Sequence, residues 1–440
     1  MPKVHACIAA IALLLLPACS QAQPDSFDAA AIAADVTEWE DWLFATHPQP
    51  EFSMDVEAVR AGFDAVRDRL NKNHTRREAW LALAVLNPHF ADGHVTLRLP
   101  TEDHDAWLAE GGSDFTLPVR IEGDQLRVAE TVSADSRALV GERITAINGR
   151  PVGPLIRAAT DRANGDTPGL RRHIVERRFA SYLWALTGGA DDWQVTLMSA
   201  DGQTRTLTLD PQRERAGGEA ERWSLAFNGD AARLTLNTFA PTLETEFAAF
   251  IDASFAEIAE RGSDILVIDI SENGGGAHML SDHLLSYLTD QRHTPLSAVT
   301  ARITPENQAL IPGSQPGQVI SMPFAQWVEP PAEQPYRFTG RVAFLVGAGT
   351  YSQAIVLAAT VQDFDIAPIA GPGTEGRANS TGQVQLHRLA NTGLEAAAPI
   401  YVFTRASGDT SSAPIVPDLP LSGSRETQID ALITRLRTEE

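Results

Sequence analysis

The chain has 440 residues with 43% hydrophobic residues, 32 glycines and 27 prolines. This is the composition of a globular protein with many turns and two or three domains. A net charge of −22 argues against a nucleic-acid-binding protein, because phosphate binding requires clustered cations. Apart from an apolar run near the start, no stretch is apolar for long enough to span a bilayer.

The first nineteen residues form a short positive start followed by an apolar run of signal-peptide length. The run ends in Leu16-Pro17-Ala18-Cys19, which resembles a bacterial lipobox whose cysteine becomes acylated. Ordinary cleavage after Ala22 is the alternative. In either case we expect an exported protein. The preferred interpretation is a periplasmic or outer-membrane lipoprotein of a bacterium, in contact with the membrane only through a lipid anchor at Cys19.

Cysteine and lysine are both scarce in the sequence. The two cysteines, Cys7 and Cys19, lie in the predicted leader. The mature protein is therefore expected to have no disulfide and no thiol nucleophile, despite an oxidising compartment. The only lysines are Lys3 and Lys72. Since Lys3 leaves with the leader, a mechanism based on lysine would depend on Lys72 alone.

Residues 27–90 are expected to be helical, because apolar residues such as Val36, Trp39, Val59 and Phe63 recur near a helical period. The segment 79–87, AWLALAVLN, is apolar nearly all round and should be buried. After a signal peptide at 1–19, residues 20–112 are therefore predicted to form a helical N-terminal domain, with its helices ending near Ala91.

From residue 115 the chain changes to short strands separated by turns. Asn148-Gly149 is a strong hairpin signal between apolar strands, and the stretch around it resembles the core of a PDZ domain. Residues 113–212 are expected to form a β-rich PDZ-like module, which would bind extended peptide at a sheet edge. A helical insert at 154–186 would alter or block that groove. A β-rich spacer is the alternative.

After about residue 222, apolar strands alternate with helices, which predicts α/β layers around a buried, largely parallel sheet. The strand 342–346 leads through a glycine-rich turn to Ser352 at the start of a helix. Such a turn exposes a hydroxyl beside free backbone N–H groups that stabilise negative charge. By itself, this pattern favours a plain helix N-cap role for Ser352, because serine is a preferred N-cap residue. A second buried strand, 265–270, ends at Gly274-Gly275-Gly276, which lets the backbone approach a ligand closely.

The segments DILVIDISENGGG and VAFLVGAGTYSQA together resemble the carboxyl-terminal processing and tricorn core serine peptidases. The resemblance covers about residues 30–420. It implies a crotonase-like (ClpP-like) β/α spiral for a catalytic domain at 213–440, with Ser352 as the nucleophile and peptides or proteins as substrates. The residues that match the family motifs are Asp269, Asn273, Gly275, Gly276, Thr350, Ser352, Ala354, Gly371, Thr374, Gly376, Pro417 and Asp418.

The family contains two mechanisms that differ in the general base. The Ser-Lys branch has its lysine where this sequence has Arg377, and a guanidinium cannot be deprotonated in a protein. The tricorn-like branch uses a histidine from the region before the PDZ-like module, where Asp92-Gly93-His94 matches its pattern. The resemblance therefore implies His94 as general base. His278 and His387 are the alternatives, because both lie near family motifs.

The remaining site residues follow from family position. An acidic residue shortly before the terminal Pro-Asp pair would orient the imidazole, which favours Asp409 and then Glu395. The backbone N–H groups of Gly275 and Gln353 are expected to form the oxyanion hole. Arg377 is expected to bind a substrate carboxylate or to hold a loop.

No cofactor or metal is expected. His278, Asp282 and His283 lie within two helical turns, and His278 and Asp282 share one face of the helix. This pair has no third ligand at zinc spacing. Ser271 and Arg377 depart from the family pattern and leave an alternative function open. In that alternative, the chain is a catalytically idle binding protein of the same fold that holds a peptide or a lipophilic ligand.

Overall fold

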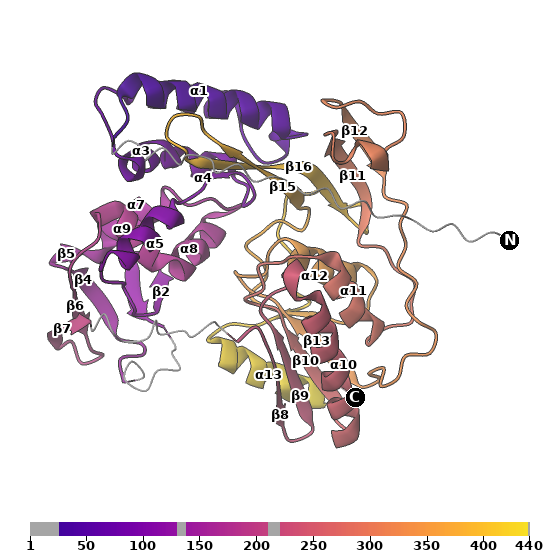
Figure 1. The fold of residues 1–440 in the computed structure, drawn as a ribbon. Helices are drawn as coiled ribbons and strands as arrows, with labels where there is room; N and C mark the ends of the chain where they lie inside the picture. Colours follow the sequence, from indigo (N-terminus) through magenta and orange to yellow (C-terminus); the bar gives the residue numbers. More distant parts are fainter. Residues whose placement is uncertain (1–25, 130–137, 210–220, 439–440) are drawn as a thin grey trace, which may run out of the picture.

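The computed structural model describes residues 26–129, 138–209 and 221–438 (Figure 1). The predicted signal peptide and Cys19 lie outside these residues. Within the described ranges, no helix combines the length and the apolar character needed to cross a membrane. The fold is mixed α/β with a helical N-terminal region and three β-sheets, which confirms the predicted fold class.

The N-terminal region consists of short helices that pack through their apolar faces. Trp39 and Phe63 are fully buried and meet edge to face, with ring centroids 5.0 Å apart. Thr75 and Glu78 form a capping box that starts the third helix. The elements are α1 Ala29–Thr46, α2 Val56–Arg69, α3 Arg76–Leu83, α4 Asn87–Phe90 and α5 Thr101–Ala109, with 3-10 helices at Pro50–Phe52 and Ala84–Leu86.

The middle segment forms an antiparallel sheet in the order β2-β3-β4-β6-β7, with the short β5 paired to β4. Asn148 and Gly149 have φ of 45° and 72°, as the tight turn between β4 and β5 requires. The edge strand β2 lies beside α8, where the Glu176 carboxylate accepts a hydrogen bond from the Ile121 N–H. The PDZ-like character of this segment stays a prediction. The elements are β2 Val119–Glu122, β3 Gln125–Val128, β4 Arg143–Ile147, β5 Arg150–Pro151, α7 Val152–Thr160, α8 Pro168–Arg177, α9 Phe179–Thr187, β6 Trp193–Met198 and β7 Thr204–Leu209.

The C-terminal segment is built on a sheet in the order β17-β14-β13-β10-β9-β8, parallel except for β8. Helices α10, α11 and α12 cover one face and α13 the other (Figure 1). Because β10 and β13 are parallel neighbours, the turns that follow them meet at one edge of the sheet. The elements are β8 Trp223–Asn228, β9 Ala231–Leu236, α10 Glu244–Arg261, β10 Ile265–Asp269, α11 His278–Ser286, β13 Arg341–Leu345, α12 Gln353–Asp363, β14 Ile369–Gly371, β17 Leu419–Pro420 and α13 Arg425–Thr438, with 3-10 helices at Pro241–Leu243 and Gln308–Leu310.

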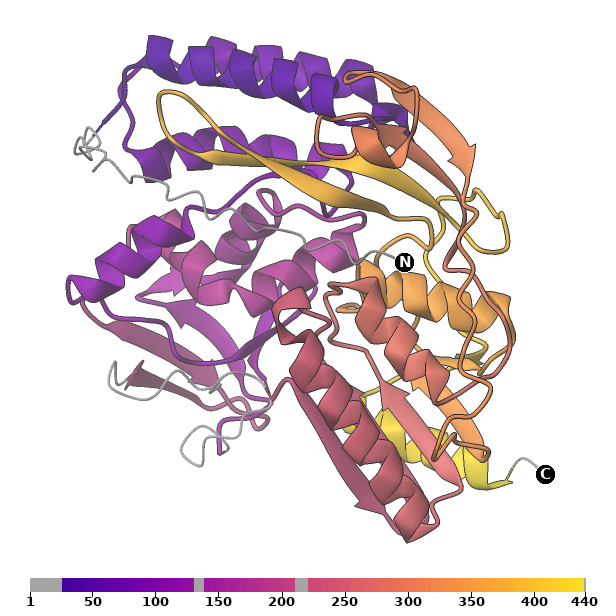
Figure 2. The same ribbon diagram turned by 45° about the vertical axis from the view of Figure 1, so that its right-hand side comes forward.

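A third sheet joins the N-terminal region to the C-terminal segment. Its strand order is β1-β16-β11-β12, and β15 pairs with β16 as a long hairpin that runs along the N-terminal helices (Figure 2). The buried Asp35 of α1 accepts hydrogen bonds from Asn391 and Thr392 at the hairpin turn, at 2.6–2.9 Å. This shared sheet fixes the segment just before β1 against the C-terminal part of the chain. The strands are β1 Thr96–Leu97, β11 Leu296–Arg302, β12 Val319–Pro323, β15 Thr381–Arg388 and β16 Glu395–Arg405.

Candidate active site

Ser352 lies between β13 and α12 in a strained backbone conformation, with φ 52° and ψ −123°. Such a conformation costs about 1–3 kcal/mol in a residue other than glycine. Ser352 is the N-cap residue of α12, but its side chain makes no capping hydrogen bond. Thr350 holds the turn, because its hydroxyl donates to the Ile270 carbonyl at 2.8 Å and accepts from the Gly347 N–H at 3.0 Å. The turn therefore aims the Ser352 hydroxyl away from its own helix.

His94 reaches this hydroxyl from the N-terminal region. Its Nε2 atom is 3.2 Å from Ser352 Oγ. The preceding loop turns sharply at Ala91, whose φ is 44°. Gly93 has no room for a side chain, since a Cβ atom there would lie 2.4 Å from the Tyr351 hydroxyl oxygen. The short loop thus brings the imidazole close to the serine.

A hydrogen-bond chain behind His94 fixes its tautomer. The Thr381 hydroxyl is 3.0 Å from Asp92 Oδ1 and 2.9 Å from His94 Nδ1. A carboxylate only accepts, so the single Thr381 proton goes to Asp92 and the Thr381 oxygen accepts from His94 Nδ1–H. In neutral His94 the Nε2 lone pair is then left for the Ser352 hydroxyl proton. This is the arrangement that a general base requires.

Asp92 is buried and also faces a second imidazole. His47, which is fully buried, accepts the Gln49 N–H at Nδ1, so a neutral ring carries its proton on Nε2, 3.8 Å from Asp92 Oδ2. Burial alone would raise the pKa of Asp92. The contacts with His47 and His94 outweigh burial and hold that pKa below its ordinary value. Asp92 is therefore ionised beside His94.

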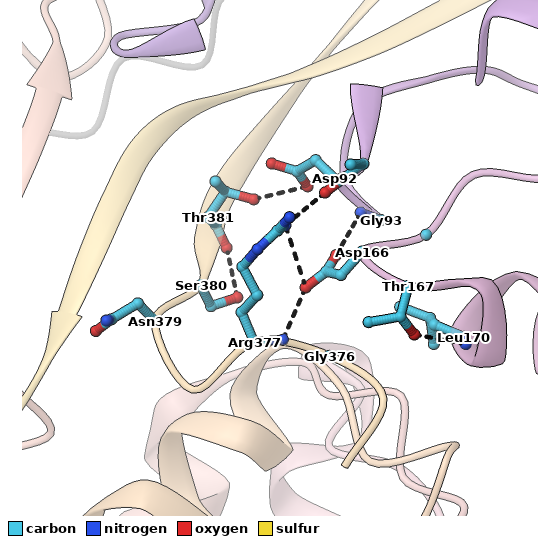
Figure 3. A network of polar contacts seen from close by, with 12 residues as sticks. Asp92, Gly93, Asp166, Thr167, Leu170, Gly376, Arg377, Asn379, Ser380 and Thr381 are labelled. Carbon is cyan, nitrogen blue, oxygen red and sulfur yellow. Dashed lines mark hydrogen bonds and ion pairs between the residues drawn. The ribbon is translucent and has the colours of Figure 1, made fainter. Parts of the chain in front are cut away.

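Arg377 and Asp166 hold the loop that carries His94 (Figure 3). Asp166 accepts from the Gly93 and Arg377 N–H groups at 2.8 and 2.9 Å, and from the Tyr351 hydroxyl at 2.9 Å. The Arg377 guanidinium lies 3.9 Å from Asp166 and donates to the Ala91 carbonyl. Burial and the charge of Asp92 raise the pKa of Asp166. Of the two roles predicted for Arg377, the structure places it against the loop.

The predicted oxyanion donors differ in availability. The Gly275 N–H donates to the Asn273 side chain at 2.8 Å. For the Gln353 N–H, the first of α12, the described residues offer no hydrogen-bond acceptor. A Cβ atom on Gly275 would lie 2.7 Å from both Gln353 N and Ser352 Cβ. Gly275 thus packs directly against the Ser352 turn, where no side chain fits. The Gln353 N–H is free to stabilise negative charge.

Ser352 opens onto a cavity of about 620 Å³. Thr381 and Gln353 also line it, and much of the wall is apolar. The apolar lining includes Leu296, Phe324, Trp327, Val356, Tyr401 and Phe403. A second cavity of about 460 Å³ is lined by Gly275 and by Tyr351, the residue before Ser352. Ser352 lines only the first cavity, which is large enough to take part of an extended chain.

Residues 230–421 match the family model described as Peptidase family S41. This segment is a peptidase S41 domain. The chain is a serine-type peptidase, which confirms the resemblance found in the sequence. The S41 domain contains Ser352 and Thr381, whereas His94 and Asp92 lie before it in the chain.

Solved structures share the fold of the whole chain. The chain is similar to mature CPAF complexed with lactacystin, with 14% identity, a TM-score of 0.65, and coverage of 93% of this chain and 99% of that one. It is also similar to the photosystem II D1 C-terminal processing protease, with 17% identity, a TM-score of 0.50, and coverage of 89% and 93%. A comparison with curated proteins found no match.

The other predicted acids and bases lie away from the His94 imidazole. The Asp409 carboxylate is exposed and accepts two hydrogen bonds from Ser411, both at 2.9 Å. Glu395 pairs with Arg98. The structure therefore does not bring Asp409 or Glu395 to His94, and the carboxylate beside the imidazole is Asp92.

The two alternative histidines differ in position. His387 stacks on Trp42 and contacts Glu38 at 2.7 Å, against helix α1. His278 lines the same cavity as Ser352, but no hydrogen bond joins the two within the described chain. Only His94 contacts the serine oxygen among the three candidates.

Sequence reasoning missed Thr381, Asp166 and Tyr351 as parts of the site, and it used Asp92 only as a motif neighbour. Thr381 meets His94 across 287 positions, a contact that no local pattern signals. Arg377 was the one residue in the sequence that could have pointed to Asp166. A cation at that position required an anionic partner, and that partner is Asp166.

Proposed function

We propose that this peptidase hydrolyses peptide bonds through an acyl-enzyme on Ser352, with His94 as general base, and that it acts outside the cytoplasm. The observation that carries the proposal is the distance of 3.2 Å between His94 Nε2 and Ser352 Oγ. The strained serine backbone and the tautomer imposed by Thr381 support the same roles. Its substrates would be the unstructured tails of proteins or peptides, in carboxyl-terminal processing or degradation.

In the acylation step, Ser352 Oγ attacks the carbonyl carbon while its proton moves to His94 Nε2. The carbonyl oxygen becomes an oxyanion next to the Gln353 N–H and the amino end of α12. Collapse breaks the C–N bond, and His94 returns the proton to the leaving amine. The result is an ester between Ser352 and the amino-terminal part of the substrate, and a released carboxyl-terminal fragment with a free amino group.

Water completes the cycle by the same route. It attacks the ester carbon, His94 takes one water proton, and the same proton then returns to Ser352 Oγ as the carboxylic acid leaves. In both halves the imidazolium is stabilised by Thr381 and by the ionised Asp92. We therefore assign the orienting role to Thr381 and Asp92 instead of Asp409.

The test is labelling with a fluorophosphonate probe, followed by mapping of the adduct by mass spectrometry. We expect the adduct on Ser352 and none in Ser352→Ala. His94→Ala should lower peptide hydrolysis by at least about 10²–10⁴-fold. Lys72→Ala is the control for the lysine mechanism and should keep wild-type activity. Labelling at another residue would refute the assignment.

The alternative function is a catalytically idle protein of the same fold. It would bind a peptide or lipophilic ligand in the cavity of about 620 Å³. Such a protein would bind equally well with Ser352 or alanine and would never release a cleaved product. The contact between His94 and Ser352 favours the peptidase, since a binding protein has no use for it.

We also propose that the chain is exported as a lipoprotein anchored at Cys19. The support is the apolar leader that ends in Leu16-Pro17-Ala18-Cys19. The full-length protein should partition into detergent and incorporate palmitate. If Cys19→Ser changes neither behaviour, cleavage after Ala22 is the correct interpretation.

A further inference from the structure

The cavity beside Ser352 contains one carboxylate. Asp282, on α11, lines it together with Ser352 and Thr381. Among the described residues that line this cavity there is no other acidic side chain and no lysine or arginine. Most of the wall around it is aromatic or aliphatic. The cavity therefore combines apolar walls with a single negative charge.

Asp282 has no direct partner in the described chain. The structure gives its carboxylate no hydrogen bond and no ion pair with any described residue, although the side chain is partly buried. Burial raises the pKa of Asp282, and the electrostatic effect of His278 and His293 acts in the opposite direction. His293 Nδ1 donates to the Gln291 carbonyl at 3.0 Å, and its buried Nε2 has no partner among the described residues.

One arginine packs on the wall of this cavity, and it is already paired. Arg292 stacks on Trp327 at 4.5 Å from the ring centroid and forms an ion pair with Glu329 at 2.7 Å. His278 is exposed and forms no ion pair with Asp282 in the described chain. A carboxylate held in apolar surroundings without a partner is costly, and burial accordingly raises its pKa. A cationic group that enters the cavity would remove that cost.

We infer that Asp282 selects substrates that carry arginine or lysine at, or next to, the residue whose carbonyl carbon Ser352 attacks. Both side chains have a long apolar stem, which fits against Phe324 and Phe403, and a charged end that would pair with the carboxylate. This inference rests on the proposed function, since it names the substrate class of the same site.

The test compares peptides that contain arginine with the same peptides containing citrulline, its uncharged isostere, at each position around the cleaved bond. The arginine peptide should have a kcat/KM at least about 30-fold higher at one position, as expected for a partly desolvated charge pair. In Asp282→Asn the ratio should fall to about one. Asp290→Asn is the matched control. It removes the same charge from an exposed carboxylate after α11 and should keep the ratio.

Two further measurements separate this inference from the proposed function. Fluorophosphonate labelling of the wild type and of the control Asp290→Asn reports whether the nucleophile is active without regard to substrate charge, because the probe carries no cation. Fluorescence anisotropy measures the binding of the arginine and citrulline peptides to Ser352→Ala, and so reports the preference for arginine without catalysis. Normal labelling with an arginine-to-citrulline ratio near one in the wild type overturns the inference alone. Loss of labelling in the wild type overturns the peptidase mechanism, while the binding ratio still tests Asp282.

Discussion

Thr381 is the residue through which the orientation of His94 can be tested most cleanly. Thr381→Val removes the hydroxyl that accepts from His94 Nδ1 at 2.9 Å and donates to Asp92 Oδ1 at 3.0 Å, and it keeps the shape of the side chain. The residue is 3% exposed, so water does not readily replace the lost group. The variant therefore breaks the link between base and carboxylate without opening a large hole.

The expected loss follows from the charge on His94 in the transition state. A hydrogen bond to a charged group contributes about 1.5–3 kcal/mol, and about 1.4 kcal/mol corresponds to tenfold in rate. We therefore expect kcat to fall roughly 10–150-fold. This is less than the loss of about 10⁴ for an orienting aspartate in a serine triad. The remaining activity reflects Asp92 Oδ1, which stays 3.8 Å from Nδ1.

The assay is steady-state hydrolysis of a quenched fluorescent peptide, with kcat and KM determined separately as a function of pH. Thr381→Ser is the matched control, because it keeps the hydroxyl and loses only a methyl group. It should retain activity within about threefold, whereas the valine variant loses kcat with little change in KM. Equal activity in all three proteins, or equal damage in the serine and valine variants, would refute the hydrogen-bond chain.

Three other changes test separate parts of the molecule. Gly275→Ala should lower fluorophosphonate labelling of Ser352 by at least about 10²-fold in a folded protein, because the alanine Cβ would lie 2.7 Å from Gln353 N. Normal labelling would show that the close packing of Gly275 against the Ser352 turn is not required. Arg377→Lys should not rescue His94→Ala in peptide hydrolysis, and recovered activity would restore the lysine mechanism. Burial raises the pKa of Glu176 from 4.5 to about 7. Between these pH values the native state binds one proton that the unfolded state has lost, so the free energy of unfolding falls as pH rises through this range. Glu176→Gln should therefore reduce the fall in stability between about pH 5 and pH 8 by roughly 2–3 kcal/mol in urea titrations, and an unchanged pH dependence would disprove this.

Much of the S41 domain could be predicted because its signals are local. The apolar strand before Ser352, the glycine-rich turn and the helix after it follow each other directly in the chain. Their backbone geometry depends on near neighbours such as Thr350 and Gly347. The alternation of buried strands and helices likewise predicts the layers around the parallel sheet.

The residues that orient the His94 imidazole could not be predicted in this way. His94 was found through a short motif, but its partner Thr381 comes from the other end of the described chain. Asp409 was chosen by family position, and the structure instead uses that carboxylate to hold Ser411 in a local turn. Which of several acids approaches an imidazole depends on how the hairpin of β15 and β16 packs, and no residue pattern specifies that packing.

The strand pairing between β1 and β16 has a consequence for the newly made chain. His94 is synthesised long before Ser352, and Thr381 later still, so a growing chain holds the base without a nucleophile. The hairpin that clamps Ala396 and Ala397 onto β1 forms only after most of the protein has been made. A nascent chain that ends before β16 lacks the strand that pairs with β1, so it cannot yet hold His94 in the position seen in the complete fold.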